Sequence, residues 1–232
     1  MMAKLKIVPI RAGVGHVYLI ITGDGFFLVD AGTKGYERKI IKAITSRGLR
    51  LENLQFIFLT HAHYDHVGGA HLLKKETEAK IIVHEQEADN LRKGYTKVPN
   101  GTDAFFKILS FLGKRMSKIY SHFKAVEPNI IFKDGYDLSA FGIQGKIIHT
   151  PGHTSGSSTL IIDKNAFAGD SIFNMLNRIY PPFANNEESL LKSWNKLLDH
   201  DVDWYYPAHG KKLKKEEIRK EFKKQTDRKG YG

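Results

Sequence analysis

The feature of this sequence that most constrains its fold is a cluster of polar side chains directly after an apolar run. Residues 60–66 read Thr-His-Ala-His-Tyr-Asp-His, and they follow the segment 55–59, Gln-Phe-Ile-Phe-Leu. Side chains alternate between two faces of an extended segment, so the first two histidines point the same way. A turn after the tyrosine would bring the aspartate and the third histidine to a neighbouring point. This arrangement suits two metal ions that lie side by side.

The stretch 60–66 resembles the signature of the metallo-β-lactamase superfamily, whose members are mostly dinuclear metal hydrolases with an αβ/βα sandwich fold. The resemblance implies three further ligands downstream, in the order His, Asp, His. The chain offers His153 in a Thr-Pro-Gly-His-Thr-Ser-Gly-Ser block, Asp170 in Ala-Gly-Asp-Ser, and His209 in Tyr-Pro-Ala-His-Gly. All seven positions occur in the family order.

The resemblance divides the expected ligands into two groups that share a bridging carboxylate. The first metal ion would be held by His61, His63 and His153, the second by Asp65, His66 and His209, with Asp170 between them. Imidazole and carboxylate ligands suit zinc, and the same set can hold iron or manganese. We therefore expect two divalent metal ions as cofactors, zinc before iron or manganese.

Two cations about 3.5 to 4 Å apart lower the pKa of a bridging water toward neutrality and so supply hydroxide at physiological pH. The expected reaction is attack of this hydroxide on a carbonyl carbon of a lactone, ester or thioester. Asp65 has a second expected role as a catalytic group. A carboxylate beside the metal can accept the hydroxide proton and return it to the leaving group.

Several neighbouring residues are predicted to support or line the site. Asp30 either orients a ligand imidazole or is an ordinary aspartate at the end of a strand, and Thr60 has a similar supporting role. Tyr64 lies inside the motif and is predicted to line the site. The candidates for substrate contacts follow the expected bridging ligand, and they are Asn174, Asn177, Arg178 and Tyr180. An aromatic hydroxyl there could donate to a developing oxyanion.

The apolar pattern predicts an α/β protein with alternating strands and helices, as in a four-layer αβ/βα sandwich. The predicted strands are 5–8, 16–21, 26–29, 55–59, 80–84, 130–132, 138–141, 145–148, 159–162, 166–168 and 203–206, and the clearest helices are 34–47 and 187–199. We expect residues 1–232 to form a single domain. There is no signal-peptide pattern and no apolar run of membrane-spanning length, so the expected location is cytoplasmic without membrane contact.

Two basic segments stand apart from this pattern. Residues 91–125 contain eight Lys or Arg and one Asp, and residues 211–232 contain ten Lys or Arg and four acidic residues, in a chain of net charge +11. The first belongs to a predicted helical insertion at 86–125, which is amphipathic from residue 102 to residue 123. This insertion is a core-packed helix, a lid that gives the metal cleft an apolar wall, or a membrane contact. The second is a predicted basic helix at 211–228.

The choice among hydrolases depends on resemblance within the superfamily. The block 150–157 resembles glyoxalase II and acyl-homoserine lactonases, and the insertion at 86–125 resembles that of the lactonases. The expected partner is therefore a small molecule with a hydrolysable carbonyl and an apolar tail. The absence of cysteine excludes a metal site of the Cys-containing type.

Three alternatives stay open. A ribonuclease Z-like phosphodiesterase would explain the basic chain, although nucleic acid is not favoured because the charge lies in solvated helices. A persulfide dioxygenase-like oxidoreductase would use His61, His153 and Asp170 around one iron. A metal-stabilised binding protein would use the ligands without turnover. The sequence predicts no oligomeric state.

Overall fold

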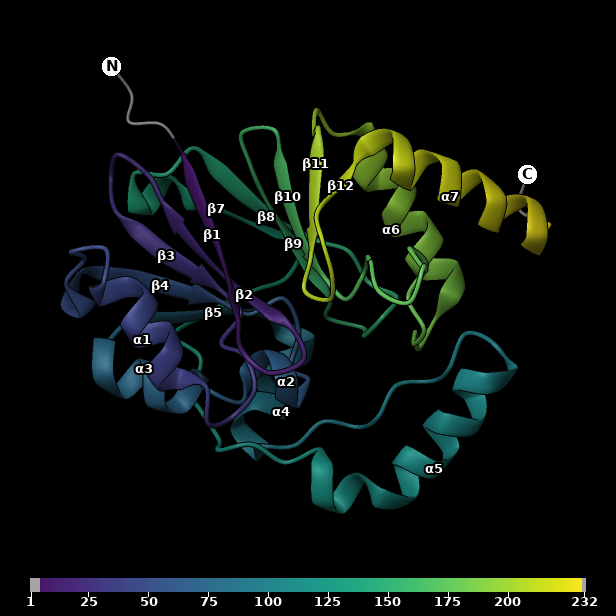
Figure 1. The fold of residues 1–232 in the computed structure, drawn as a ribbon, viewed down its shortest axis with the longest axis horizontal. Helices are drawn as coiled ribbons and strands as arrows, with labels where there is room; N and C mark the ends of the chain where they lie inside the picture. The colour runs from purple at the N-terminus through teal and green to yellow at the C-terminus, as the bar shows by residue number, and fades with distance from the viewer. Residues whose placement is uncertain (1–4, 231–232) are drawn as a thin grey trace.

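A computed structural model describes residues 5–230, apart from the side chains of residues 117–120. Two six-stranded sheets face each other, and helices cover their outer faces (Figure 1). The protein is thus a mixed α/β sandwich, as the sequence predicts.

The first sheet has the strand order β1-β2-β3-β4-β5-β6. Its strands are β1 (Lys6–Arg11), β2 (His16–Ile21), β3 (Phe26–Val29), β4 (Leu54–Phe58), β5 (Lys80–His84) and β6 (Ile130–Phe132). The helices of this half are α1 (Glu37–Thr45), η1 (Leu51–Asn53), α2 (Tyr64–Val67), α3 (Ala70–Thr77) and α4 (Glu85–Lys93). The pairs from β3 to β6 are all parallel, so the carboxyl ends of these four strands lie at one edge.

The second sheet has the order β12-β11-β10-β9-β8-β7. Its strands are β7 (Gly135–Asp137), β8 (Gly145–His149), β9 (Ser158–Ile162), β10 (Asn165–Gly169), β11 (Trp204–Pro207) and β12 (Leu213–Lys214), with η2 (Leu138–Phe141), α6 (Glu187–Asp199) and α7 (Lys215–Lys229). β10 and β11 are parallel, and β9 is antiparallel to both β8 and β10. The carboxyl ends of β8, β10 and β11 therefore share an edge.

The predicted strand at 138–141 is wrong, because these residues form the 3-10 helix η2. The Asp137 carboxylate accepts a 2.7 Å hydrogen bond from the backbone N–H of Ser139, which caps this turn. Gly142 ends it with φ of +74°. Asp137 and Gly142 are local signals for a capped turn that the apolar pattern hides.

Three apolar clusters hold the four layers together. The first joins one face of the first sheet to α1, α3 and α4, through residues such as Ile44, Leu73 and Leu91. The second lies between the sheets and includes Phe56 and Phe167. The third joins the second sheet to α6 and α7, and its members include Trp194, Leu197 and Ile218.

The two sheets meet where the ligand-bearing loops lie. The backbone N–H of Ser158 donates to the carbonyl of Thr60 at 3.0 Å, and that of His16 donates to Ala208 at 2.8 Å. Gly169 has φ of +52°, and a Cβ there would lie 2.5 Å from Oγ1 of Thr60. Only glycine therefore permits this approach between the ends of β4 and β10.

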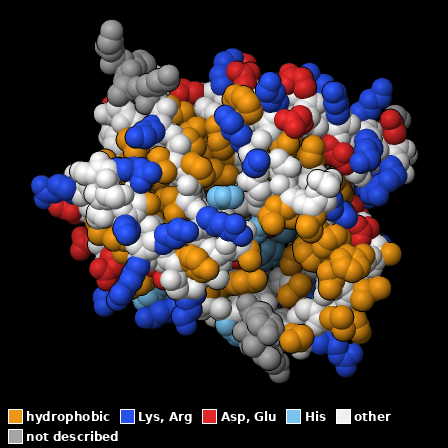
Figure 2. Space-filling view, viewed as in Figure 1, with side chains coloured by type: hydrophobic (Ala, Val, Ile, Leu, Met, Phe, Trp, Pro, Cys, Tyr) orange, Lys and Arg blue, Asp and Glu red, His pale blue; other side chains and the backbone are white. Residues whose placement is uncertain are grey.

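Helix α5 (Ala104–Tyr120) lies at the periphery, apart from both sheets (Figure 1). Its large apolar side chains include Phe105, Ile108, Phe111 and Leu112, which are 50–64% exposed. Figure 2 shows hydrophobic side chains gathered at its place. The structure therefore does not pack this face of α5 into the core. No helix in the described part of the chain combines the length and apolar character needed to cross a bilayer.

Candidate metal centre

The ligand motif of residues 60–66 begins extended and then turns into a helix. β4 ends at Phe58, and His63 still has extended dihedral angles (φ −74°, ψ 148°) directly before α2. His61 and His63 therefore precede the helix, whereas Asp65 and His66 belong to it. The turn that the sequence predicts after Tyr64 is the first turn of α2.

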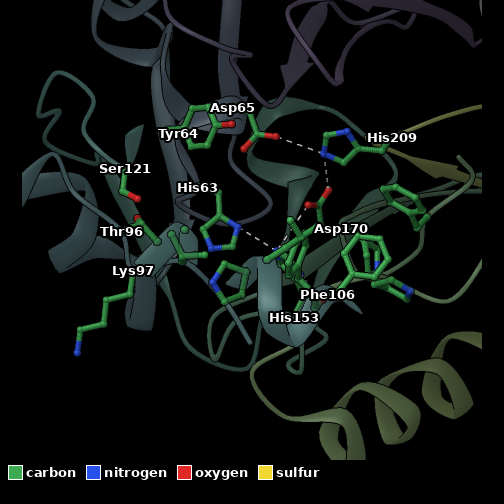
Figure 3. A pocket seen from close by; sticks show the side chains of 18 of the residues that line it. His63, Tyr64, Asp65, Thr96, Lys97, Phe106, Ser121, His153, Asp170 and His209 are labelled. Atoms are coloured by element: carbon green, nitrogen blue, oxygen red, sulfur yellow. Dashed lines mark hydrogen bonds and ion pairs between the residues drawn. The ribbon is translucent and has the colours of Figure 1, made fainter. Parts of the chain in front are cut away.

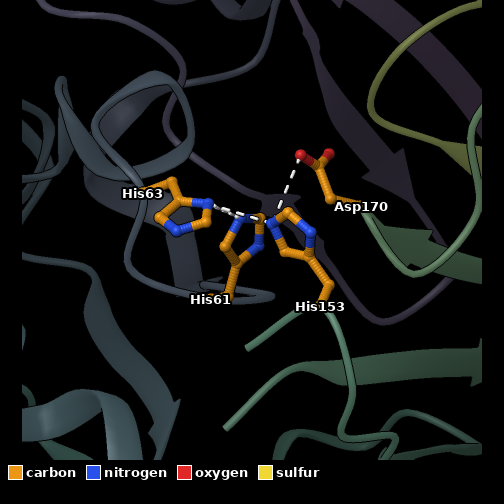
Figure 4. A group of neighbouring side chains, drawn as sticks. All are labelled: His61, His63, His153 and Asp170. Carbon is orange, nitrogen blue, oxygen red and sulfur yellow. Dashed lines mark hydrogen bonds and ion pairs between the residues drawn. The ribbon is translucent and has the colours of Figure 1, made fainter. Parts of the chain in front are cut away.

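The structure brings all seven predicted ligands together. His61, His63, His153 and Asp170 form one group, and Asp65, His66 and His209 form another; within each group the candidate ligand atoms lie within 4.8 Å of one another. Figure 4 shows the first group, with its side chains drawn from the loops after β4, β8 and β10. All five histidines are at most 8% exposed.

Hydrogen bonds to the second ring nitrogen set the tautomers of the first group. The Thr60 hydroxyl donates to Asp30, so its oxygen accepts from Nδ1 of His61 at 3.1 Å. Nδ1 of His153 donates to the carbonyl of Phe183 at 2.9 Å. Both Nε2 atoms therefore present lone pairs.

These two lone pairs face the same atom. Nε2 of His61 and Nε2 of His153 each lie 2.9 Å from Nδ1 of His63. One proton on that nitrogen cannot satisfy both contacts, whereas a divalent cation bound by these imidazoles would satisfy the lone pairs of both Nε2 atoms. Nε2 of His63 is itself buried and has no hydrogen-bond partner among the described residues. The donor set thus fits a divalent metal ion.

The second group combines imidazoles with carboxylates. Nδ1 of His66 donates to Asp30 at 2.8 Å, and Nδ1 of His209 donates to the carbonyl of Val14 at 3.3 Å. Their Nε2 atoms therefore point toward the carboxylates of Asp65 and Asp170. Nε2 of His209 lies 3.3 Å from Oδ2 of Asp65. This set also fits a divalent cation.

Asp170 lies between the two groups. Its Oδ1 is 3.2 Å from Nε2 of His66 and 3.3 Å from Nε2 of His209, and its Oδ2 is 3.6 Å from Nε2 of His153. The contact with His66 is close but lacks hydrogen-bond geometry, since both atoms are buried without a hydrogen-bond partner in the described structure. One carboxylate thus presents an oxygen to each group.

The two groups differ in their electrostatics. Burial, and then the neighbouring His153, lower the pKa of His63 to about 3. Burial would also lower the pKa of His209, but the carboxylates of Asp170 and Asp65 outweigh it and raise that pKa to about 10. Metal-free protein therefore keeps the three imidazoles of the first group neutral and the two imidazoles of the second group protonated, where a cation would displace the protons.

Asp30 and Thr60 lie where an orienting role requires them. Asp30 adopts a left-handed conformation (φ +64°) directly after β3, and its side chain accepts a 2.8 Å hydrogen bond from the backbone N–H of Thr60. Through this carboxylate and the threonine hydroxyl it reaches both His61 and His66. The orienting role itself stays a prediction.

Glu87 is a residue of this site that the sequence reasoning missed. Its carboxylate is 1% exposed and accepts hydrogen bonds from the backbone N–H of Ala62 at 3.2 Å and from the Thr154 hydroxyl at 2.6 Å. Burial raises the pKa of Glu87, and these hydrogen bonds oppose that shift. One signal was available, because Glu87 follows the predicted strand 80–84 as Asp30 follows 26–29.

An apolar cleft of about 410 Å³ opens beside the candidate ligands. Figure 3 shows His63, Asp65, His153, Asp170 and His209 at this cleft, together with Phe106 of α5. Leu109, Phe173, Pro182 and Phe183 also line it. The first half of α5 therefore contributes an apolar wall to the cleft.

The predicted substrate contacts are placed differently from one another. Tyr64 lines the cleft and is 40% exposed. Nδ2 of Asn174 donates to the carbonyl of Lys211, and the Tyr180 hydroxyl donates to Glu187, both at 2.9 Å. The residues that line the cleft do not include any of these four candidates: Asn174, Asn177, Arg178 and Tyr180.

Arg178 instead attaches α5 to the body of the protein. It forms a 2.6 Å ion pair with Asp103, and its guanidinium lies 4.9 Å from the ring centroid of Phe106. The Thr102 hydroxyl also donates to the carbonyl of Pro181 at 2.8 Å. A substrate role for Arg178 stays a prediction.

Comparison with known proteins places the chain in a family. The model of the metallo-beta-lactamase superfamily matches residues 10–209. A probable metallo-hydrolase of Methanocaldococcus jannaschii is 26% identical over 197 residues, which cover 83% of this chain and 86% of that protein. A probable metallo-hydrolase of Streptococcus pyogenes is 26% identical over 200 residues, covering 84% and 78%.

Solved structures show the same fold. A metallo-beta-lactamase family protein from Thermus thermophilus superposes with a TM-score of 0.72 at 20% identity, over 98% of this chain and 79% of that one. A subclass B3 metallo-beta-lactamase of Bradyrhizobium japonicum gives 0.64 at 24% identity, over 88% and 74%. Since the family match extends over most of the sequence and includes all seven clustered side chains, the chain belongs to the metallo-beta-lactamase superfamily.

Proposed function

We propose that the protein is a dinuclear metal-dependent hydrolase that cleaves a lactone, ester or thioester. The observation that carries this proposal is the convergence of seven imidazole and carboxylate groups at an apolar cleft. The residues that would hold the ions are His61, His63 and His153 for one, Asp65, His66 and His209 for the other, and Asp170 for both. This donor set favours zinc, with iron or manganese as alternatives. When bound, the two ions supply Lewis acidity and hydroxide at neutral pH.

We assign the proton transfer of this reaction to Asp65. Its side chain is 12% exposed and lines the cleft, and its Oδ2 lies 3.3 Å from Nε2 of His209. A carboxylate in this position can accept the proton of the attacking water and return it to the leaving group. Tyr64 also lines the cleft, which supports a role for it in substrate contact.

The cleft supports a small substrate with an apolar tail. Four apolar side chains present carbon surface to whatever occupies the cleft, and they are Phe106, Leu109, Phe173 and Phe183. Lys97 is the one Lys or Arg among the described residues that line the cleft. Nucleic acid binding depends on many cations along the backbone path, so this lining supports a carbonyl substrate over a phosphodiester.

The test is a substrate screen with zinc-loaded protein. The substrates are aryl esters, acyl lactones, acyl thioesters and bis-p-nitrophenyl phosphate. We expect turnover of at least one carbonyl substrate, loss of activity with chelator, and a drop in kcat/KM of at least about 100-fold in His61→Ala and Asp170→Asn. His200→Ala, a histidine outside the site, is the matched control and should retain activity.

Three results would contradict the proposal. Activity that survives both ligand substitutions would mean that the metal groups are not the catalytic centre. Turnover confined to the phosphate diester would favour the nuclease alternative. One iron per chain, with oxygen consumed during turnover, would favour oxidoreductase chemistry.

A further inference from the structure

Glu87 connects two loops that are far apart in the sequence. Oε2 accepts from the backbone N–H of Ala62, and Oε1 accepts from the hydroxyl of Thr154 and, at 3.2 Å, from the backbone N–H of Gly156. Nδ2 of Asn90, on the next turn of α4, donates to Oε2 at 3.3 Å. The carboxylate thus accepts four hydrogen bonds in a position almost without solvent.

Both loops carry ligands of the same metal group. Ala62 lies between His61 and His63, and Thr154 directly follows His153. The three imidazoles of the first group therefore extend from backbone segments that one carboxylate holds. No member of the second group, which consists of Asp65, His66 and His209, is adjacent in sequence to a residue that donates to Glu87.

The fit between Glu87 and the loop after β8 is close. A Cβ at Gly156 would lie 2.6 Å from Cγ of Glu87, so the loop backbone passes directly over this side chain. The Thr154 hydroxyl also lies 2.8 Å from Oγ of Ser157, which itself accepts from the backbone N–H of Thr154 at 3.0 Å. Several hydrogen bonds therefore fix this loop, and the Glu87 carboxylate accepts two of them.

The fold explains why a residue of α4 reaches this position. β5 is parallel to β4, so its carboxyl end lies at the same edge as the end that carries the histidine motif. α4 begins directly after β5, and Glu87 lies in its first turn. The side chain of Glu85, in the same turn, is exposed.

We propose that Glu87 is a positioning residue for the first metal group, so that the affinity for one of the two ions depends on its carboxylate. The second group has a separate support, the bond from His66 to Asp30. This inference rests on the proposed function, because it requires two bound ions. Groups that orient metal ligands typically contribute about 10- to 100-fold in metal affinity.

Two substitutions remove this support without emptying the space. Glu87→Gln replaces one acceptor oxygen with an NH2 group, which must face a donor from Ala62 and Asn90 or from Thr154 and Gly156. Thr154→Val keeps the shape of the loop and removes the hydroxyl that donates at 2.6 Å. Glu85→Gln is the matched control, since it makes the same chemical change at an exposed position of the same turn.

The experiment measures Zn²⁺ stoichiometry and affinity by titration against a chelator, with thermal unfolding of the metal-free proteins to establish that each is folded. We expect wild type and Glu85→Gln to bind two ions. Glu87→Gln and Thr154→Val should bind one ion with wild-type affinity and the other about 10- to 100-fold more weakly.

Two further backgrounds identify the affected group. In His209→Ala, which disables the second group, adding Glu87→Gln should weaken binding of the remaining ion. In His61→Ala, which disables the first group, the same addition should leave the remaining ion unchanged. This difference separates positioning of one group from a general loss of structure.

The outcomes are distinguishable. Equal weakening of both ions in Glu87→Gln, or no change in either, would overturn the inference while leaving the proposed function in place. A wild-type protein that binds fewer than two ions would contradict the proposed function and the inference with it.

Discussion

Nδ1 of His66 donates a 2.8 Å hydrogen bond to Oδ2 of Asp30, and this contact joins two loops that are 36 residues apart in sequence. Both side chains are at most 3% exposed. Because the same carboxylate also accepts from the backbone N–H and hydroxyl of Thr60, one buried acceptor orients the ends of β3 and β4. We therefore expect the orientation of His66 to depend on Asp30, which belongs to neither group of candidate ligands.

The first prediction concerns Asp30. Asp30→Ala should lower metal affinity about 10- to 100-fold, because His66 loses the acceptor that fixes its ring. It should also lower the free energy of unfolding by about 3 kcal/mol or more, since three buried donors lose their acceptor. Chelator competition and denaturant unfolding measure the two effects. Asp24→Ala, at an exposed turn, is the control; wild-type metal affinity in Asp30→Ala would contradict the prediction.

The second prediction concerns the pH dependence of the metal-free protein. The lowered pKa of His63, about 3 against 6.5 when unfolded, contributes stability that is present above pH 6.5 and is lost as pH falls toward 3. The raised pKa of His209, about 10, contributes stability that is present below pH 6.5 and is lost as pH rises through 10. Stability in the presence of chelator should therefore be greatest near pH 6.5.

Thermal unfolding with chelator between pH 5 and 9.5 checks this sign. His209→Asn should flatten the alkaline side of the profile and leave the acidic side unchanged. Metal ions replace the protons of the second group, so the stabilisation by added zinc should grow from pH 6.5 upward. A metal-free protein whose stability rises steadily to pH 9.5 would contradict the assignment.

The third prediction concerns the attachment of α5. Arg178→Ala removes the ion pair with Asp103 and the contact with Phe106, both at the amino-terminal end of the helix. We expect faster amide hydrogen exchange in residues 101–112 and a higher KM, with unchanged metal stoichiometry. Lys192→Ala, which removes an exposed ion pair on α6, is the control. Exchange equal to wild type would show that other contacts suffice to hold the helix.

The fourth prediction concerns the cleft wall. Burying a methylene contributes about 0.8 kcal/mol, so lengthening the acyl tail of a substrate should lower KM by up to about fourfold per carbon until the cleft is full. Leu109→Ser should weaken this dependence, because Leu109 lines the cleft. Leu112→Ser, on the exposed face of the same helix, should not. An identical chain-length dependence in both variants would mean that the tail binds elsewhere.

Much of the metal centre was predictable because ligand types and strand ends are local properties. The histidines of residues 60–66 follow an apolar strand, and His153, Asp170 and His209 each follow another. Since parallel strands end at the same edge, separate motifs could be expected to meet, and the structure brings them together. The prediction of an α/β sandwich is confirmed for the same reason, because alternating strands and helices leave few ways to bury both faces of two sheets.

Other features were not predictable because they depend on which buried groups face each other. Glu87 reads as an ordinary acidic residue in a first helical turn, and nothing nearby in the sequence shows that Ala62 and Thr154 point at it. Arg178 follows the expected bridging carboxylate in sequence, a position that predicts substrate contact, yet its guanidinium pairs with Asp103 across 75 residues. The apolar residues of α5 predicted a helix correctly but did not predict which of its faces would stay exposed.

The sequence by itself determined the seven ligand types, their order and the strands that carry them, because each is encoded by a few adjacent residues. Only the folded structure shows which acceptor binds the outer ring nitrogen of each candidate ligand histidine. It also decided that one buried carboxylate supports two ligand loops. These are contacts between residues distant in the chain, and they exist only once the two sheets have packed face to face and closed their ligand-bearing edge.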